Sequence, residues 1–177
     1  MPVMIKQYQF WALGVVVISL CLFAFTWLPA ARTTVVFPLD TSHAGNNQLT
    51  INYPLAVREG EKTPIIVKIV MPAIDTNTVV RARWDLRNAA VLPQGEVYAP
   101  IASGNTTLTW QMTPGKGADG TFWLSLIKDN QEEPILARQF TFPIQTYFSL
   151  SAQTLRILSA ISMSLSLIAL AFLRRQI

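Results

Sequence analysis

Two uncharged apolar runs, one near each end of the 177-residue chain, constrain its fold more than any other feature. The first run is FWALGVVVISLCLFAFTWL, from Phe10 to Leu28, and the second extends from Ile157 to Leu173. With its flanking residues, each run reaches the length of about 20 residues that an α-helix needs to cross a hydrocarbon core. The sequence therefore predicts membrane helices over residues 10–28 and 155–173, with a separate domain between them.

The net charge of +4 is concentrated beside these runs. All ten acidic residues lie in the middle of the chain, where basic residues balance them. The excess positive charge comes from Lys6, Arg156, Arg174 and Arg175. Charge in these places is typical of membrane topology, and it argues against nucleic acid as a partner.

Because positive residues are enriched on the cytoplasmic side, Lys6 predicts a cytoplasmic tail over residues 1–9, and Arg174 and Arg175 predict another over residues 174–177. The middle of the chain is then periplasmic or extracellular, and we expect an integral protein of the plasma or inner membrane. The same two arginines are expected to anchor the second helix at its inner interface.

Trp11 and Trp27 are expected to anchor the two ends of the first helix at the membrane interfaces. A cleaved signal peptide is the alternative for this segment. The apolar run is longer than the about 7–15 residues of such peptides, and LPAAR offers Leu28 or Pro29 where a small residue is needed. A retained anchor is therefore favoured.

Small side chains form one stripe along the second predicted helix. They are spaced by 3, 4 and 3 residues: Ser159, Ser162, Ser166 and Ala169. Because apolar contact alone gains little in lipid, this stripe predicts a helix-packing face, whereas Ser164 lies off it and is expected to bond its own backbone. The expected partners are membrane lipid and other integral membrane subunits.

Neither run contains an ionisable residue in its interior, which argues against a proton path or a histidine-ligated haem. We therefore predict no cofactor. Whether a lipid or carotenoid lies between the helices stays open.

Residues 48–146 have the texture of an all-β sandwich, with short alternating segments separated by turn residues. The expected strands cover residues 49–53, 63–71, 78–86, 106–112, 121–127 and 135–142. TPGKGADG is expected to be a turn between two of them. Residues 29–47 are either a linker or an added strand, and residues 147–154 form a short junction.

In TVVRARWDLR, alternation directs Val80, Ala82, Trp84 and Leu86 toward a core. Here Trp84 resembles the core tryptophan of immunoglobulin-like or fibronectin-like sandwiches, and DGTFWLSL resembles their penultimate strand. The resemblance implies an antiparallel β-sandwich between the two spans and implies no function.

The chain also departs from that family. Phe122 lacks the hydroxyl of the usual tyrosine corner, and Ile69 and Leu124 stand near the positions of the disulfide cysteines. The single cysteine, Cys21, lies in the first run, so no disulfide within the chain forms.

Possible partner contacts lie on the outward face of the predicted sheet. Trp123 beside Ile127 is typical of a contact, although the 29–47 segment is an alternative cover for it. The row Arg81, Arg83 and Arg87 either meets an acidic partner or headgroups or is a solvated strand face.

The catalytic and metal-binding interpretations are weaker. His43 has no oriented partner, and His43, Met71 and Met112 lack metal-ligand spacing. An enzyme would need a pocket that pairs this histidine with an acid. The candidate acids are Asp85, Glu96 and Asp119.

Our hypothesis is therefore a non-catalytic accessory or structural subunit of a larger respiratory, photosynthetic or transport complex. It would pack through its helices and brace partners with its outer β domain. The alternative is a membrane-tethered ligand-binding or sensory module of the cell envelope.

Overall fold

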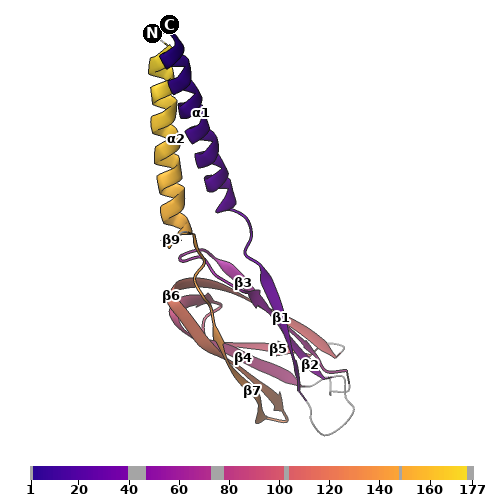
Figure 1. Ribbon diagram of the computed structural model, residues 1–177. Coiled ribbons are helices and arrows are strands. Elements are labelled where there is room, and N and C mark those ends of the chain that lie inside the picture. Colours follow the sequence, from indigo (N-terminus) through magenta and orange to yellow (C-terminus); the bar gives the residue numbers. More distant parts are fainter. Residues whose placement is uncertain (1, 40–46, 73–77, 102–103, 148, 175–177) are drawn as a thin grey trace. The chain divides into compact units, whose positions relative to one another are not determined.

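The computed structural model describes residues 2–39, 47–72, 78–101, 104–147 and 149–174 (Figure 1). The chain forms two compact units. The helical unit combines the two ends, Met1–Pro29 and Gln145–Ile177, and the β unit is the segment between them, Ala30–Ile144. Most of the described β structure is antiparallel, and both helices are long and apolar enough to span a membrane.

The helical unit contains α1 (Pro2–Phe25) and α2 (Ala152–Arg174), with a short ladder between β8 (Thr146–Tyr147) and β9 (Leu150–Ser151) before α2. Helix α1 begins at Pro2, ahead of the predicted membrane span at residues 10–28, because proline is well suited to the first turn of a helix and no breaker follows it. The helix ends in tight turns in which Trp27 N–H donates to Ala24 O at 3.0 Å.

The β unit is one seven-stranded sheet in the order β1-β2-β3-β6-β4-β5, with β7 paired to β6. Its strands are β1 (Arg32–Pro38), β2 (Gln48–Pro54), β3 (Thr63–Val70), β4 (Val79–Leu92), β5 (Glu96–Pro100), β6 (Asn105–Lys128) and β7 (Gln131–Thr141). Of the two alternatives for residues 29–47, the structure has the added strand, because β1 pairs with β2 over its whole length. The short strand β5 was not predicted.

The prediction of a turn at TPGKGADG is wrong, because β6 runs without a break through this segment. The first half of β6 pairs with β3, as in Ile65 opposite Trp110, and the second half pairs with β7, as in Trp123 opposite Ala137. Strand β4 follows both halves, with a register shift between Arg87 and Ala89. Residues 115–118 therefore bulge opposite Asn88, and the two strands turn a corner together.

Glycine in this segment permits the close approach of β6 to β4 at the corner, and it does not form the turn that was expected. A Cβ on Gly120 would lie 2.4 Å from Leu86 Cδ2 and 2.5 Å from Asp85 O, so only glycine permits this approach of β6 to β4. Asn88 has φ 53°, a left-handed conformation that asparagine adopts more readily than most residues. Sequence alone does not distinguish glycine needed for close approach from glycine needed for a turn.

The corner folds the sheet over on itself, so that its two parts enclose one core. Ring contacts join the parts, with Trp110 and Phe122 at 6.1 Å and Tyr53 and Phe140 at 5.3 Å between centroids. Trp84 is buried against Phe122, as alternation predicted, whereas Leu86 is only half-buried. The expectation of an antiparallel β fold around a core that includes Trp84 is therefore confirmed.

Candidate functional site

The contact between α1 and α2 is polar at its centre. Ser19 and Ser159 are each 5% exposed, and Thr26 is fully buried. Ser19 Oγ donates a hydrogen bond to Ser162 Oγ at 3.2 Å. Such hydroxyl contacts associate helices in an apolar solvent, where apolar surface alone provides little driving force.

The predicted stripe of small residues follows this contact for part of its length. Ser159 and Ser162 lie in it, and Ser166 is half-buried. Ala169 is exposed, and Leu170 is half-buried instead. A stripe with a 3-4-3 spacing drifts around a helix that has 3.6 residues per turn, so its last member leaves the contact face. Ser164 Oγ donates to Ala160 O at 2.8 Å, which confirms the expected bond to its own backbone.

Arg156 of α2 joins the end of α1 through three contacts. Its Nε donates to Thr26 Oγ1 at 3.0 Å, and its Nη2 donates to Thr26 O at 2.8 Å. The guanidinium also lies 4.0 Å from the ring centroid of Trp27, a cation–π contact. Sequence analysis found Arg156 only as a charge beside the second run, since pairing it with Thr26 requires the register of the two helices.

The predicted interface anchors are described in part. Trp11 on α1 and Trp27 in the turn after it are both exposed, and Trp27 has the contact with Arg156. The side chain of Arg174 and all of Arg175 lie outside the described residues, so their predicted role stays a prediction.

On the outward face of β4, the arginine row is largely neutralised within the chain. Arg81 donates to the carboxylates of Glu96 and Glu132. Arg83 donates to Asp85 at 3.0 Å, and its Nη1 lies 3.6 Å from Glu96 Oε1. The row is therefore not an unopposed cationic patch for an acidic partner.

Hydrogen bonding in this network shifts three pKa values. The bond from Arg81, followed by the bond from the Tyr98 hydroxyl at 2.7 Å, lowers the pKa of Glu96. The same bonds to Glu96 raise the pKa of Arg81 and that of Tyr98. The network therefore keeps Glu96 ionised and Tyr98 neutral at ordinary pH.

Trp123 is 41% exposed on the same face, and β1, the described strand of the 29–47 segment, pairs with β2. Its neighbours along the strand, Thr121 and Ser125, are small, as is Ala137 opposite it on β7, whereas Arg83 lies opposite it on β4. The Arg83 guanidinium lies 5.6 Å from the ring centroid of Trp123. Ile127, predicted as part of a contact, is half-buried.

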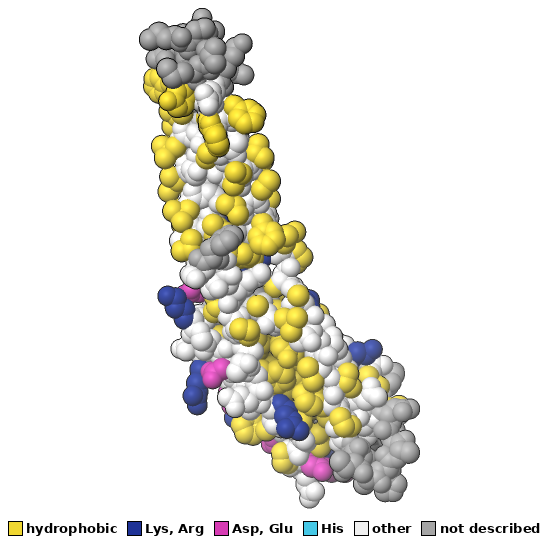
Figure 2. Space-filling model, in the orientation of Figure 1, with side chains coloured by type: hydrophobic (Ala, Val, Ile, Leu, Met, Phe, Trp, Pro, Cys, Tyr) yellow, Lys and Arg dark blue, Asp and Glu magenta, His cyan; other side chains and the backbone are white. Residues whose placement is uncertain are grey.

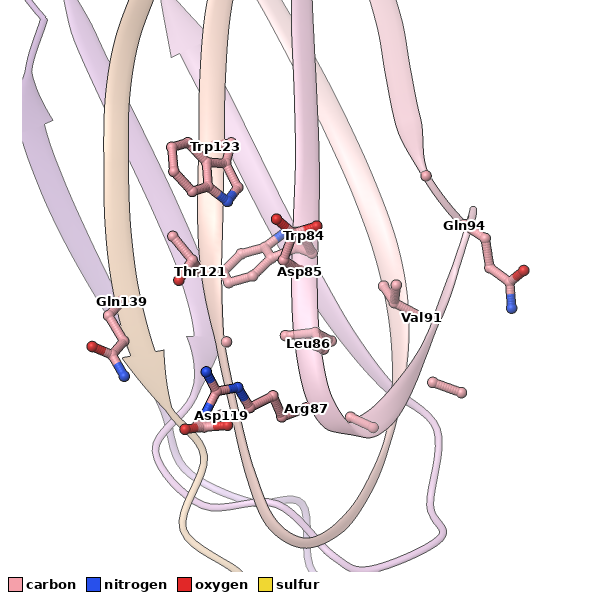
Figure 3. A pocket seen from close by; sticks show the side chains of 14 residues that line it. Trp84, Asp85, Leu86, Arg87, Val91, Gln94, Asp119, Thr121, Trp123 and Gln139 are labelled. Atoms are coloured by element: carbon pink, nitrogen blue, oxygen red, sulfur yellow. The ribbon is translucent and has the colours of Figure 1, made fainter.

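A cavity of about 560 Å³ lies beside Trp123, at the corner of β4 and β6 (Figure 3). Its lining includes Asp85, Arg87, Asp119, Thr121, Trp123 and Gln139. Arg87 and Asp119 are cross-strand partners, and Figure 3 shows their side chains directed toward one another. Sequence analysis missed this cavity because it depends on the corner that replaced the predicted turn.

Among the described residues, no group of three or more His, Cys, Asp or Glu side chains could hold a metal ion. His43, the histidine that an enzyme would need beside an acid, lies outside the described residues. Asp85 and Asp119 line the cavity, and Glu96 belongs to the arginine network.

No protein-family model and no curated protein sequence matches the chain. Among solved structures it is similar to the complex of Zinc 2-glycoprotein and Prolactin inducible protein from human seminal plasma, with 9% identity, 60% of this chain and 100% of that chain covered, and a TM-score of 0.42. A Bacteroides thetaiotaomicron lipoprotein has 12% identity, covers 67% of this chain and 84% of its own, and has a TM-score of 0.34. A conjugative transposon lipoprotein from Bacteroides eggerthii has 11% identity and a TM-score of 0.33, and the match covers 63% of this chain and 95% of that one. These likenesses are too weak to carry an argument.

Proposed function

We propose that this chain is a non-catalytic accessory subunit of a larger membrane protein complex of the respiratory, photosynthetic or transport class. The two helices anchor it and pack against partner subunits, and the β unit braces those partners on the outer side. The observation that carries this proposal is the inverted polarity of the helical unit. Ser19, Ser159 and Thr26 are buried where the two helices meet, and most of the large side chains exposed on α1 and α2 are apolar.

The outer surface of the helical unit needs an apolar environment. Exposed side chains include Leu13, Val17 and Leu20 on α1, and Leu165 and Ile168 on α2. Figure 2 shows apolar side chains over the length of both helices. A continuous apolar surface of this kind is unfavourable in water, so we expect lipid and other membrane helices to surround it.

The proposed topology follows from charge. Lys6 before α1 and the arginines at the end of α2 support cytoplasmic ends for both helices. The β unit then lies on the periplasmic or extracellular side. An immunoglobulin-like relationship for this unit is part of the proposal, supported by the buried Trp84 and the antiparallel sheet folded around one core.

A ligand-binding or sensory module of the cell envelope is the second candidate. The cavity beside Trp123 favours it, because concave sites with a few convergent polar groups commonly hold small molecules. The two functions are compatible in one chain, and each has its own test.

The accessory function is tested by replacing both Ser162 and Ser166 with leucine. The Ser162 hydroxyl bonds Ser19, so the larger side chains are expected to separate α2 from α1 and to release the chain from its partners. Affinity purification from native membranes in mild detergent is expected to recover stoichiometric partners with the wild type and to lose them with the double variant.

Ser164→Leu is the matched control, since Ser164 is exposed and bonds only the backbone of its own helix. It is expected to retain the partners, and the urea midpoint of the β unit is expected to be the same in all three proteins. The proposal would be contradicted by a monodisperse wild-type chain that purifies without stoichiometric partners. Equal recovery of partners with the wild type and the double variant would also contradict it.

A further inference from the structure

We propose that the corner cavity of the β unit binds a neutral carbohydrate, with one sugar ring stacked on Trp123 and its hydroxyls bonded by the polar side chains around it. The cavity volume of about 560 Å³ lies within the range of small-ligand sites, about 300–1,000 Å³. This binding goes beyond the accessory function and does not depend on it.

The cavity is built on a fixed part of the fold. Its floor consists of β4 and the second half of β6, which pair with each other, and β6 also pairs with β7 on its other side. Gly120 brings β6 close to β4 at this point. A site on paired central strands holds its side chains more precisely than a site on loops.

Trp123 provides an accessible aromatic ring. Its neighbours Thr121, Ser125 and Ala137 are small, and the side chain is 41% exposed although Arg83 lies opposite it on β4. An aromatic face carries partial negative charge, which attracts the C–H groups on one side of a sugar ring. The Arg83 guanidinium lies over this ring, 5.6 Å from its centroid, so a sugar would stack on the ring face that Arg83 does not occupy.

The polar lining supplies both donors and acceptors. Asp85 accepts hydrogen bonds, Gln139 offers an amide that donates and accepts, and Thr121 offers a hydroxyl. Each sugar hydroxyl is itself both a donor and an acceptor, so a mixed lining of this kind satisfies several hydroxyls at once. A lining with only donors or only acceptors would leave part of each hydroxyl unsatisfied.

Balanced charge argues against an anionic ligand. Arg87 lies opposite Asp119 across the strands, and the Arg83 guanidinium already bonds Asp85 at 3.0 Å. Sites for phosphate or carboxylate groups instead gather arginines without compensating acids.

The cavity is also poorly suited to a peptide. Strand addition requires an unpaired sheet edge, and β6 has none at Trp123, because it pairs there with β4 and β7. A docked helix requires a continuous apolar groove, whereas Asp85, Arg87 and Asp119 interrupt this one. A protein contact at Trp123 is therefore an outcome of the test and not part of the proposal.

Isothermal titration calorimetry of the full chain with maltohexaose, cellohexaose and chitohexaose tests the proposal. The detergent is a polyoxyethylene ether, because the sugar headgroup of an alkyl glycoside would compete for the cavity. At least one oligosaccharide is expected to bind, with an affinity that changes little between low and high salt, as befits a neutral ligand.

Trp123→Ala is expected to weaken that binding by about tenfold or more, as truncation of a central aromatic contact does. Tyr98→Ala is the matched control, because Tyr98 is an exposed aromatic on the same face that does not line the cavity. The affinity of Tyr98→Ala for the oligosaccharide is expected to stay within about twofold of the wild-type value. Gln139→Leu, at an exposed position, is a second variant that is expected to weaken binding should Trp123→Ala fail to fold.

Three results would overturn the proposal. The first is no binding of any of the oligosaccharides by the wild type. The second is undiminished binding by folded Trp123→Ala or Gln139→Leu. The third is unchanged oligosaccharide binding together with loss of co-purifying subunits in Trp123→Ala, which would make this ring a protein contact.

Discussion

The two units of this protein are built with opposite polarity. In the helical unit Ser19, Ser159 and Thr26 are buried, while most of the large apolar side chains are exposed, and only 6% and 11% of the two apolar segments are buried. In the β unit Trp110 and Phe122 are fully buried, and the ion pairs of Arg81 and Arg83 lie on the outward face of β4. Each unit buries the kind of side chain that its surroundings solvate poorly. The polarity of the helical unit therefore fits an apolar environment, and that of the β unit fits water.

The two units should consequently be held together by different forces. The β unit depends on apolar area removed from water, which is worth roughly 25 cal/mol per Å². The helical unit depends on a few hydroxyl and guanidinium hydrogen bonds, each worth about 0.6 to 2 kcal/mol within a membrane. Four substitutions or conditions can break or sharpen this difference.

The largest effect is expected from Trp110→Ala. Trp110 is fully buried and contacts Phe122, so its truncation leaves a cavity and is expected to lower the unfolding free energy of the β unit by about 3–5 kcal/mol. Trp123→Ala, on the same strand but exposed, is expected to cost less than about 0.5 kcal/mol. Urea unfolding of the full chain in detergent measures both, and equal costs would contradict the account of the core.

Gly120→Ala is expected to have the next largest effect. The added methyl group would meet Leu86 Cδ2 at 2.4 Å and Asp85 O at 2.5 Å, and overpacking of this kind typically costs about 1–3 kcal/mol. In the helical unit, a Cβ on Gly14 meets nothing within 4 Å, so Gly14→Ala is expected to be neutral or slightly stabilising. A tolerated Gly120→Ala would show that β4 and β6 do not need this close approach.

Arg156→Ala tests the helical unit at its strongest contact. The substitution removes two hydrogen bonds to Thr26 and the contact with Trp27, and it is expected to destabilise the helix pair by about 1–2 kcal/mol. Titration with SDS, followed by the helical circular dichroism signal, measures the loss. Arg156→Lys is the comparison variant, because lysine keeps the charge without the planar fork and should restore only part of the stability. Full recovery with lysine would mean that charge alone matters here.

The smallest effect is the pH dependence of the arginine network. The pKa of Glu96 is lowered from 4.5 in the folded protein, so its stabilising contribution is complete above about pH 4.5 and is lost as the pH falls through the lower folded value. The pKa of Tyr98 is raised from 10.0, so its contribution is complete below pH 10.0 and is lost as the pH rises through the folded value. Urea midpoints across pH are expected to decline at both ends, and Glu96→Gln is expected to flatten both declines. Unchanged profiles in that variant would refute the assignment.

Patterns local to the sequence predicted much of the fold. Alternation identified the buried face of β4 up to Trp84, and the apolar runs identified α1 and α2, because these signals need no knowledge of distant residues. The continuous β6 could not be predicted in this way. Gly120 in this strand is explained by the approach of Leu86, a residue more than thirty positions away along the chain.

The candidate sites were predictable only as residue types. Trp123 was correctly expected to point outward, and Ser159 and Ser162 were correctly expected to share a helix face. The partners of these residues were not predictable, since Ser19 and Arg83 reach them through tertiary register. The arginine row is the clearest example, because its neutralisation depends on β5, a strand that the sequence did not reveal.

The length of β6 also sets the order in which the β unit can assemble. Strand β6 pairs with β3, β4 and β7, and it follows β1 to β5 in the chain. During synthesis, at about 5–20 residues per second, the earlier strands therefore wait several seconds with one edge unpaired. Strands β3 and β4 are then the segments most in need of a chaperone, and a stall in synthesis before residue 128 would leave them open to pairing with another chain.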